Sequence, residues 1–143
     1  MGKVIKISKA TKRSTSDFSE TEWHKIDHAH YGRRVEWNEQ KFRFKATESG
    51  KLVGLISGKH ESGVIYIGQV ITAEGARGKG IGTLLIQKAE EFGKGLGAHK
   101  MWLITGKEWK ENEFYKKLGF TLEGTLPSHH FHIDFVIYSR PIK

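Results

Sequence analysis

The feature that most constrains the fold is a long strand pattern followed by a short glycine-rich turn and a helix pattern. Across this turn, the spacing of the apolar residues changes from that of a strand to that of a helix. Residues 64–72 are mostly apolar and rich in β-branched side chains, which predicts a buried strand. From Ile81 to Leu96 the apolar residues keep to one face of an amphipathic helix. A short apolar run at 101–104 predicts a further strand. A strand, a helix and a strand in this order predict a βαβ crossover between two parallel strands.

Further strand and helix patterns lie on both sides of this crossover. Residues 42–46 and 52–56 read as strands separated by short turns, which favours an antiparallel meander with the long strand. After the crossover, we expect a helix over 109–118, which carries apolar residues at helical spacing. Two last strands are expected over 120–122 and 133–138.

The amino-terminal part predicts one strand and one helix. Apolar residues among lysines at 4–7 indicate a first strand, and the polar, basic stretch 8–16 reads as a loop. Ser19 is followed three residues later by Glu22, which is the spacing of a capping box. We therefore expect a helix that starts there and ends near Gly32.

Taken in order, these elements predict an α/β fold. We expect a mixed, mostly antiparallel central sheet with one βαβ crossover and with helices on both faces. A length of 143 residues fits one domain, which we expect to span residues 1–143.

The composition narrows the class of function. Lys plus Arg is 24 and Asp plus Glu is 16, so the net charge is +8, which attracts nucleic acid, acidic lipid or a phosphorylated ligand. The basic residues are spread along the chain, which favours a solvated surface or a local anion site over nucleic-acid binding. There is no apolar run of about 18 residues and no signal-peptide pattern, so we expect no membrane span and a cytoplasmic protein. The absence of cysteine excludes a disulfide scaffold, a thiolate zinc site and a cysteine nucleophile.

The turn before the amphipathic helix carries the strongest chemical signal. Glycine lets a ligand approach the backbone closely, and the first N–H groups of a helix attract an anion such as a pyrophosphate. The spacing fits neither the nucleotide P-loop nor the dinucleotide pattern G-x-G-x-x-G. The alternative is that the glycines only make the start of the helix flexible and that no ligand binds there. The segment consists of Arg77, Gly78, Lys79, Gly80, Ile81, Gly82 and Thr83.

Two segments together resemble a known family. Residues 77–82 (RGKGIG) resemble the R/Q-x-x-G-x-G/A signature of the GNAT superfamily of acetyl-CoA-dependent N-acetyltransferases. Residues 114–120 (FYKKLGF) resemble a later segment of the same family, and the likeness is strongest over 64–126. The resemblance implies a GNAT-like fold and acetyl transfer from acetyl-CoA to an amine-bearing small molecule or peptide.

The resemblance also implies roles for individual residues. The N–H groups of the glycine segment would hold the pyrophosphate of acetyl-CoA, and Tyr115 would protonate the leaving thiolate. The end of the long strand would pair with the pantetheine arm, and the Val70 N–H would polarise the thioester carbonyl. The implied acetyl-CoA-binding residues are Val70, Ile71, Thr72, Arg77, Gly78, Lys79, Gly80, Ile81, Gly82 and Thr83.

The chain departs from the family pattern at two places. Where many members carry an asparagine before the tyrosine, this chain has Glu108, and the nearest asparagine is Asn112. The long strand also lacks a carboxylate that could act as the general base. Glu61, Tyr66 or a chain of water molecules stay open for that role. One helix where the family usually has two implies a more open acceptor pocket.

The remaining candidates are histidines and alternative classes of function. His129, His130 and His132 precede the last strand, where the resemblance implies a loop beside the acceptor site. A histidine that acts as base or contacts the substrate is one interpretation, and a polar loop without such a role is the other. We expect no metal site there, because further ligands are lacking. A non-catalytic acyl-CoA-binding module and a basic nucleic-acid-binding domain are the competing hypotheses. The family also admits a homodimer.

Overall fold

The computed structural model describes residues 3–143 and divides into two units, each described by itself below. The first unit ends at Trp37 and the second spans Asn38–Lys143. None of the helices formed by the described residues has the length and apolarity needed to span a bilayer. The single domain expected over residues 1–143 stays a prediction.

The first unit consists of one helix, α1 (Lys12–Tyr31), and the segments beside it. The helix starts earlier than the expected Ser19, because Thr11 caps it: the Thr11 side chain accepts a hydrogen bond from the Ser14 N–H at 3.1 Å. It ends as predicted at Gly32, which adopts a left-handed conformation with φ 72°.

The strand predicted over residues 4–7 is absent, and this prediction is wrong. Residues 3–10 form neither helix nor strand, and Val4, Ile5 and Ile7 are exposed. The alternation of lysine and apolar residues is a strand pattern, but a strand needs a neighbour for its backbone groups. No strand of the described residues pairs with this segment.

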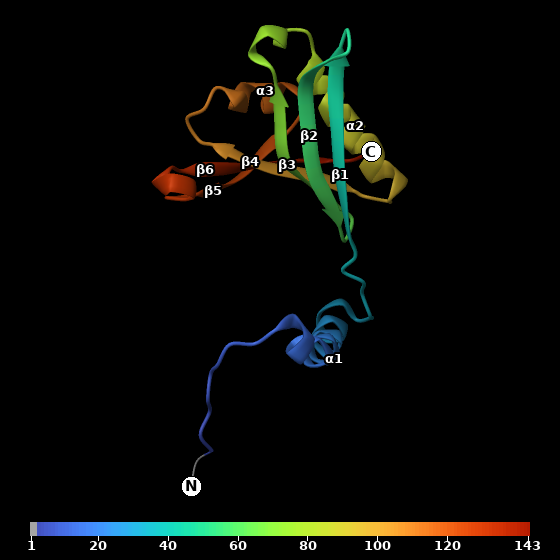
Figure 1. Cartoon of the computed structure of the whole chain (residues 1–143), viewed down its shortest axis with the longest axis vertical. Helices are drawn as coiled ribbons and strands as arrows, with labels where there is room; N and C mark the ends of the chain where they lie inside the picture. Colours follow the sequence, from blue (N-terminus) through green and yellow to red (C-terminus); the bar gives the residue numbers. More distant parts are fainter. Residues whose placement is uncertain (1–2) are drawn as a thin grey trace. The chain divides into compact units, whose positions relative to one another are not determined.

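The second unit is built on a six-stranded mixed sheet with the order β1-β2-β3-β4-β6-β5 (Figure 1). The predicted meander is confirmed, since β1, β2 and β3 pair antiparallel through short turns. The predicted crossover is confirmed as well, since β3 and β4 are parallel. The strands are β1 (Glu39–Glu48), β2 (Lys51–Glu61), β3 (Val64–Thr72), β4 (Lys100–Gly106), β5 (Thr121–Leu126) and β6 (Phe135–Pro141).

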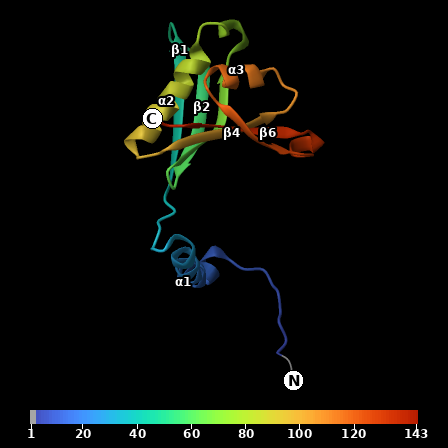
Figure 2. The ribbon, with the colours of Figure 1, turned by 180° about the vertical axis from the view of Figure 1, so that it is seen from behind.

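Two helices, α2 (Ile81–Gly95) and α3 (Glu111–Lys117), pack on this sheet. Residues of both helices belong to one buried cluster, so within residues 38–143 both cover the same face (Figure 2). The expectation of helices on both faces is therefore met on one face only in this unit. The structure confirms the predicted α/β class and the mostly antiparallel sheet.

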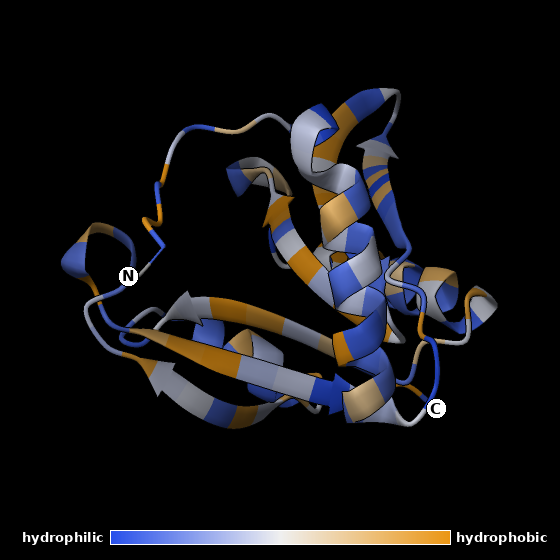
Figure 3. Cartoon of the chain, turned by 90° about the horizontal axis from the view of Figure 1, so that it is seen from below, coloured by the Kyte–Doolittle hydropathy of each residue, from blue (hydrophilic) through white to orange (hydrophobic). Residues whose placement is uncertain are grey.

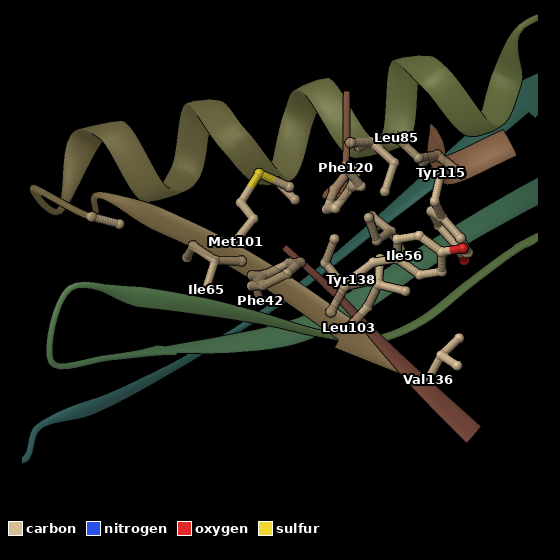
Figure 4. Packing of buried hydrophobic residues seen from close by; sticks show 14 residues of the cluster. Phe42, Ile56, Ile65, Leu85, Met101, Leu103, Tyr115, Phe120, Val136 and Tyr138 are labelled. Carbon is tan, nitrogen blue, oxygen red and sulfur yellow. The ribbon is translucent and has the colours of Figure 1, made fainter. Parts of the chain in front are cut away.

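The hydrophobic core lies between the sheet and these two helices (Figure 4). Alternate residues of the strands point into it, and this alternation is visible as changing hydropathy along the strands in Figure 3. Fully buried side chains come from four strands and from α2, so the core fixes the helices against the sheet. The largest of them are Ile56, Ile65, Ile86, Met101, Leu103 and Tyr138.

Candidate active site

The parallel strands β3 and β4 pair over three residues only and then separate. The pairs are Val64 with Lys100, Ile65 with Met101 and Tyr66 with Trp102. A β-bulge in β3 follows two residues later, at Gly68, since Ile67 pairs with Gly58 of β2 and Gln69 with the adjacent Ser57. A bulge bends its strand and terminates pairing. The carboxyl-terminal half of β3 therefore has one edge that no other strand of the described residues covers.

The register of β3 decides which backbone groups face this uncovered edge. The Ala73 N–H donates to the Val53 carbonyl of β2 at 2.8 Å. Backbone groups alternate between the two edges of a strand, so the N–H groups of Val70 and Thr72 point away from β2. Arg77 agrees with this, since its Nε donates to the Thr72 carbonyl from the uncovered side at 3.4 Å. By the same alternation, Ile71 turns its backbone groups toward β2.

The glycine segment forms an open backbone cradle at the start of α2. Gly78 and Gly80 have φ angles of 83° and 80°, which side chains other than glycine rarely adopt. A Cβ built on either residue would meet nothing within 4 Å, so the space before the backbone is free. The first intrahelical bond runs from the Leu84 N–H to the Gly80 carbonyl at 3.1 Å. The N–H groups of residues 81–83 thus face outward, as an anion requires.

Gly82 has a different reason to be glycine. A Cβ there would lie 3.0 Å from the Phe114 ring of α3. The residue therefore permits close packing of α2 against α3, rather than opening space for a ligand.

The two basic side chains of the segment are already engaged. Lys79 pairs with Glu48 at the end of β1 at 3.0 Å, and Arg77 binds the Thr72 carbonyl. Both sites are exposed, so such contacts contribute little stability. Lys79 and Glu48 both line a groove of about 660 Å³ between β1 and α2. An anion at this cradle would therefore meet backbone N–H groups first, rather than these side chains.

Tyr115 lies on α3 within the hydrophobic core, at the side where the two strands separate. It is 8% exposed, and its ring packs on Phe120 and Tyr138 with centroid distances of 5.8 and 6.2 Å (Figure 4). Burial, with a smaller contribution from the Glu111 carboxylate, raises the pKa of Tyr115 to about 12. The phenol therefore keeps its proton at neutral pH, as a proton donor must.

Residues 9–120 match the sequence profile of the acetyltransferase (GNAT) family. The matched stretch is well over half of the chain and contains the cradle, both separating strands and Tyr115. The chain belongs to the GNAT family. This membership confirms the resemblance inferred from the two motifs, which is to a family of acetyltransferases.

Relatives agree with this assignment. An uncharacterized N-acetyltransferase of Methanocaldococcus jannaschii is 30% identical over 138 residues, covering 82% of this chain and 61% of the relative. The chain thus spans about 61% of the length of the curated relative it matches.

Solved structures share the fold at low sequence identity. An acetyltransferase from Bacillus cereus superimposes with a TM-score of 0.71 at 18% identity, over 96% of this chain and 97% of that chain. An aminoglycoside 6'-N-acetyltransferase complexed with coenzyme A gives 0.66 at 18% identity, over 72% of this chain and 73% of that chain.

The structure explains one departure from the GNAT pattern. Glu108 is exposed, whereas Asn112 is buried on the first turn of α3. The Asn112 amide donates to the carbonyls of Gly106 and Trp109 at 2.9 and 2.5 Å, and its oxygen accepts from the Tyr138 hydroxyl at 2.8 Å. Sequence reasoning missed this role, because Tyr138 lies 26 residues further along the chain.

The candidates for a general base lie at different places along β3. Glu61 precedes β3, at the end opposite to Val70, so it lies far from the uncovered edge. Tyr66 lies at the last paired position, and its ring packs on Trp102 with a centroid distance of 4.6 Å. Of the two side chains, Tyr66 is therefore nearer to the site.

The histidine loop connects β5 to β6 at the end of β4 that carries Gly106. His129 and His130 pack on Phe135, with centroid distances of 5.6 and 5.1 Å. His132 contacts the Ser128 hydroxyl instead, at 3.5 Å. Among residues 3–143, no three metal-ligating side chains converge here or elsewhere.

Proposed function

We propose that the chain transfers an acetyl group from acetyl-CoA to a primary amine. The observation that carries this is the succession of two features along the chain: the uncovered edge of β3 at Val70 is followed, after residues 73–77 with their short 3-10 helix Glu74–Ala76, by the open cradle of Gly78 and Gly80. One feature suits an amide-bearing arm and the other a pyrophosphate, and acetyl-CoA contains both. A neighbour of the same fold was solved with coenzyme A.

In this proposal the binding groups are mostly backbone. The N–H groups of residues 78–83 hold the pyrophosphate, and Arg77 and Lys79 add positive charge nearby. The backbone groups of Val70 and Thr72 at the uncovered edge bind the pantetheine arm in the manner of an added strand, whereas Ile71 turns its own toward β2. The Val70 N–H points toward the thioester carbonyl and stabilises negative charge on its oxygen.

The chemistry then follows as direct transfer in a ternary complex. The lone pair of the neutral amine attacks the thioester carbon, and the tetrahedral intermediate collapses by breaking the carbon–sulfur bond. Tyr115 supplies a proton to the sulfur, which leaves as the thiol of coenzyme A. The proton of the attacking nitrogen passes to a base, for which Tyr66 or a water chain is suited by position. No covalent enzyme intermediate is needed, in line with a chain that has no cysteine.

The acceptor is an amine on a small molecule or a peptide. The net charge of +8 disfavours a polyamine and favours a neutral or acidic molecule that carries the amine. The histidine loop, 128–133, lies at the Gly106 end of β4 and is the element available to contact it.

A second candidate function is acyl-CoA binding without catalysis. It is favoured by one observation, the absence of any carboxylate from β3 next to the uncovered edge. The cradle would still hold acetyl-CoA in this case, but the amine would not be deprotonated efficiently.

Thiol release from acetyl-CoA, followed with a disulfide dye over a panel of amines and peptides, separates the two functions. The chain contains no cysteine and so contributes no thiol signal. Amine-dependent release supports acetyl transfer and identifies the acceptor class. If acetyl-CoA raises the melting temperature but no amine in the panel causes release, the binding module is favoured. If acetyl-CoA neither binds nor reacts, both proposals are wrong.

A further inference from the structure

The helix that carries Tyr115 is too short to hold its own position. α3 has seven residues, and no side chain caps its amino-terminal end. Isolated helices of this length are unstable in water, so packing and contacts at the two ends decide where the helix lies. Both ends are held by residues of one strand, β6.

The first contact lies at the amino-terminal end of α3. The Tyr138 hydroxyl of β6 donates to the Asn112 oxygen at 2.8 Å, and both side chains are buried. Asn112 also binds the carboxyl-terminal end of β4, since its amide nitrogen donates to the Gly106 carbonyl at 2.9 Å. Asn112 and Tyr115 lie three residues apart, hence on one face of the helix. The Tyr138 ring also packs on the Tyr115 ring.

The second contact lies at the carboxyl-terminal end. Arg140, two residues after Tyr138 and on the same face of β6, donates from Nη1 to the Leu118 carbonyl at 2.6 Å. This carbonyl follows the last turn of α3, where helices leave carbonyls without partners. Glu90 of α2 holds the other arm of the guanidinium, and the Phe120 ring lies under it at 5.0 Å.

We propose that Tyr138 and Arg140 form a two-point clamp that positions Tyr115 for the acetyl-transfer reaction. Both act through α3 and Tyr115 rather than on the substrate, so both are positioning residues. The clamp explains how a seven-residue helix can hold a phenol in one place beside the separating strands. The inference rests on the proposed function only for its kinetic consequence, because the contacts exist without any ligand.

Kinetics of two variants test the first point of the clamp. Tyr138→Phe keeps the ring and removes only the hydroxyl, so the core stays filled. We expect kcat to fall about tenfold, while KM for acetyl-CoA, which depends on the cradle, changes less than twofold. In a Tyr115→Phe background, the same change should have no further effect on kcat, since Tyr138 would act through Tyr115. Equal effects in both backgrounds would overturn the proposal.

A control variant separates positioning from a general loss of stability. Ile65→Val removes one methyl group from the core at the paired end of β3, away from α3. At a temperature well below both melting points, we expect Ile65→Val to leave kcat unchanged while Tyr138→Phe lowers it. A fall in kcat that follows melting temperature in both variants would overturn the clamp.

Arg140→Lys and Arg140→Met test the second point. Lysine retains the charge and can still reach either Glu90 or the Leu118 carbonyl, so we expect it to restore part of the kcat lost in the methionine variant. If both variants behave like the parent chain, the second point of the clamp is wrong.

A titration tests the clamp without any turnover. Ultraviolet absorbance of the chain minus that of Tyr115→Phe reports the ionisation of Tyr115 alone. With the clamp loosened by Tyr138→Phe or Arg140→Met, the pKa of Tyr115 should fall from its raised value toward 10 as water reaches the phenol. An unchanged titration in both variants would overturn the clamp, whereas absence of turnover in the parent chain would overturn only the proposed function.

Discussion

The cradle of residues 78–83 and the helix α3 contribute to the proposed acetyl-CoA site by opposite means. The cradle is exposed and made of backbone, and its two left-handed glycines face free space. The α3 region is buried and made of side chains, and its tyrosine is 8% exposed among aromatic rings. A backbone cradle depends on local conformation, whereas the position of Tyr115 depends on strands distant in the sequence. Substitutions should therefore affect binding in the first region and turnover in the second.

The largest effect is expected for Tyr115→Phe. Losing the proton donor should lower kcat by about 100-fold or more, with KM for acetyl-CoA changed little. Steady-state kinetics over a range of pH values measures this. An unchanged kcat at every pH would show that another group protonates the thiolate.

Gly80→Val should mainly weaken binding. Valine is strained at φ 80°, and its side chain would fill the free space before the cradle, so the Kd for acetyl-CoA should rise roughly 10- to 100-fold. Titration calorimetry measures this. Gly97→Val is the matched control, since Gly97 has φ 78° and equally free space, but at the other end of α2. Equal losses of affinity in both variants would place the pyrophosphate elsewhere.

Alkaline pH should affect the buried region through the ionisation of Tyr115. Since the pKa of Tyr115 is raised to about 12, the unfolded chain loses this proton first, near pH 10. The stability linked to this tyrosine is complete below about pH 10 and is lost as the pH rises toward 12. Tyr115→Phe removes this loss of stability. From pH 8 to pH 11, the melting temperature of the parent chain should therefore fall by roughly 2 to 4 °C more than that of the variant. Parallel melting curves at both pH values would contradict the raised pKa.

The smallest effect is expected at Lys79. Because its charge is shared with Glu48 on an exposed surface, Lys79→Ala should weaken acetyl-CoA binding by roughly threefold or less. Glu48→Gln releases the ammonium group and should tighten binding slightly, by a similar or smaller factor. Both effects should vanish at high salt. A large loss for Lys79→Ala would mean that side chains, rather than N–H groups, dominate the cradle.

The difference between the regions also explains what the sequence predicts. The cradle and α2 were predictable, because a change of period and glycines with basic neighbours are local signals. The bulge in β3 beyond its pairing with β4 was not, since it depends on the register of Gly58 of β2 against β3. A Cβ on Gly58 would overlap the Tyr66 carbonyl, and no local pattern reveals this. The start of α1 was missed because two capping boxes compete in the sequence and only the one at Thr11 is used.

Contacts between distant residues account for the rest. Tyr115 was predicted from a family motif, but its surroundings were not. The partners Tyr138 and Arg140 lie 26 and 22 residues beyond Asn112 and Leu118, and only the pairing of β6 with β4 brings them to α3.

The three residue pairs between β3 and β4 also have a mechanical meaning. They join two three-stranded halves of the sheet, the ribbons β1-β2-β3 and β4-β6-β5, at one end only. A force that pulls the ribbons apart would act on these few hydrogen bonds and on the core that both ribbons share. A molecule with amide groups, bound between the separated parts of β3 and β4, would form hydrogen bonds to both and resist part of that force. The sheet would then have its highest mechanical resistance to pulling while the substrate is bound between β3 and β4.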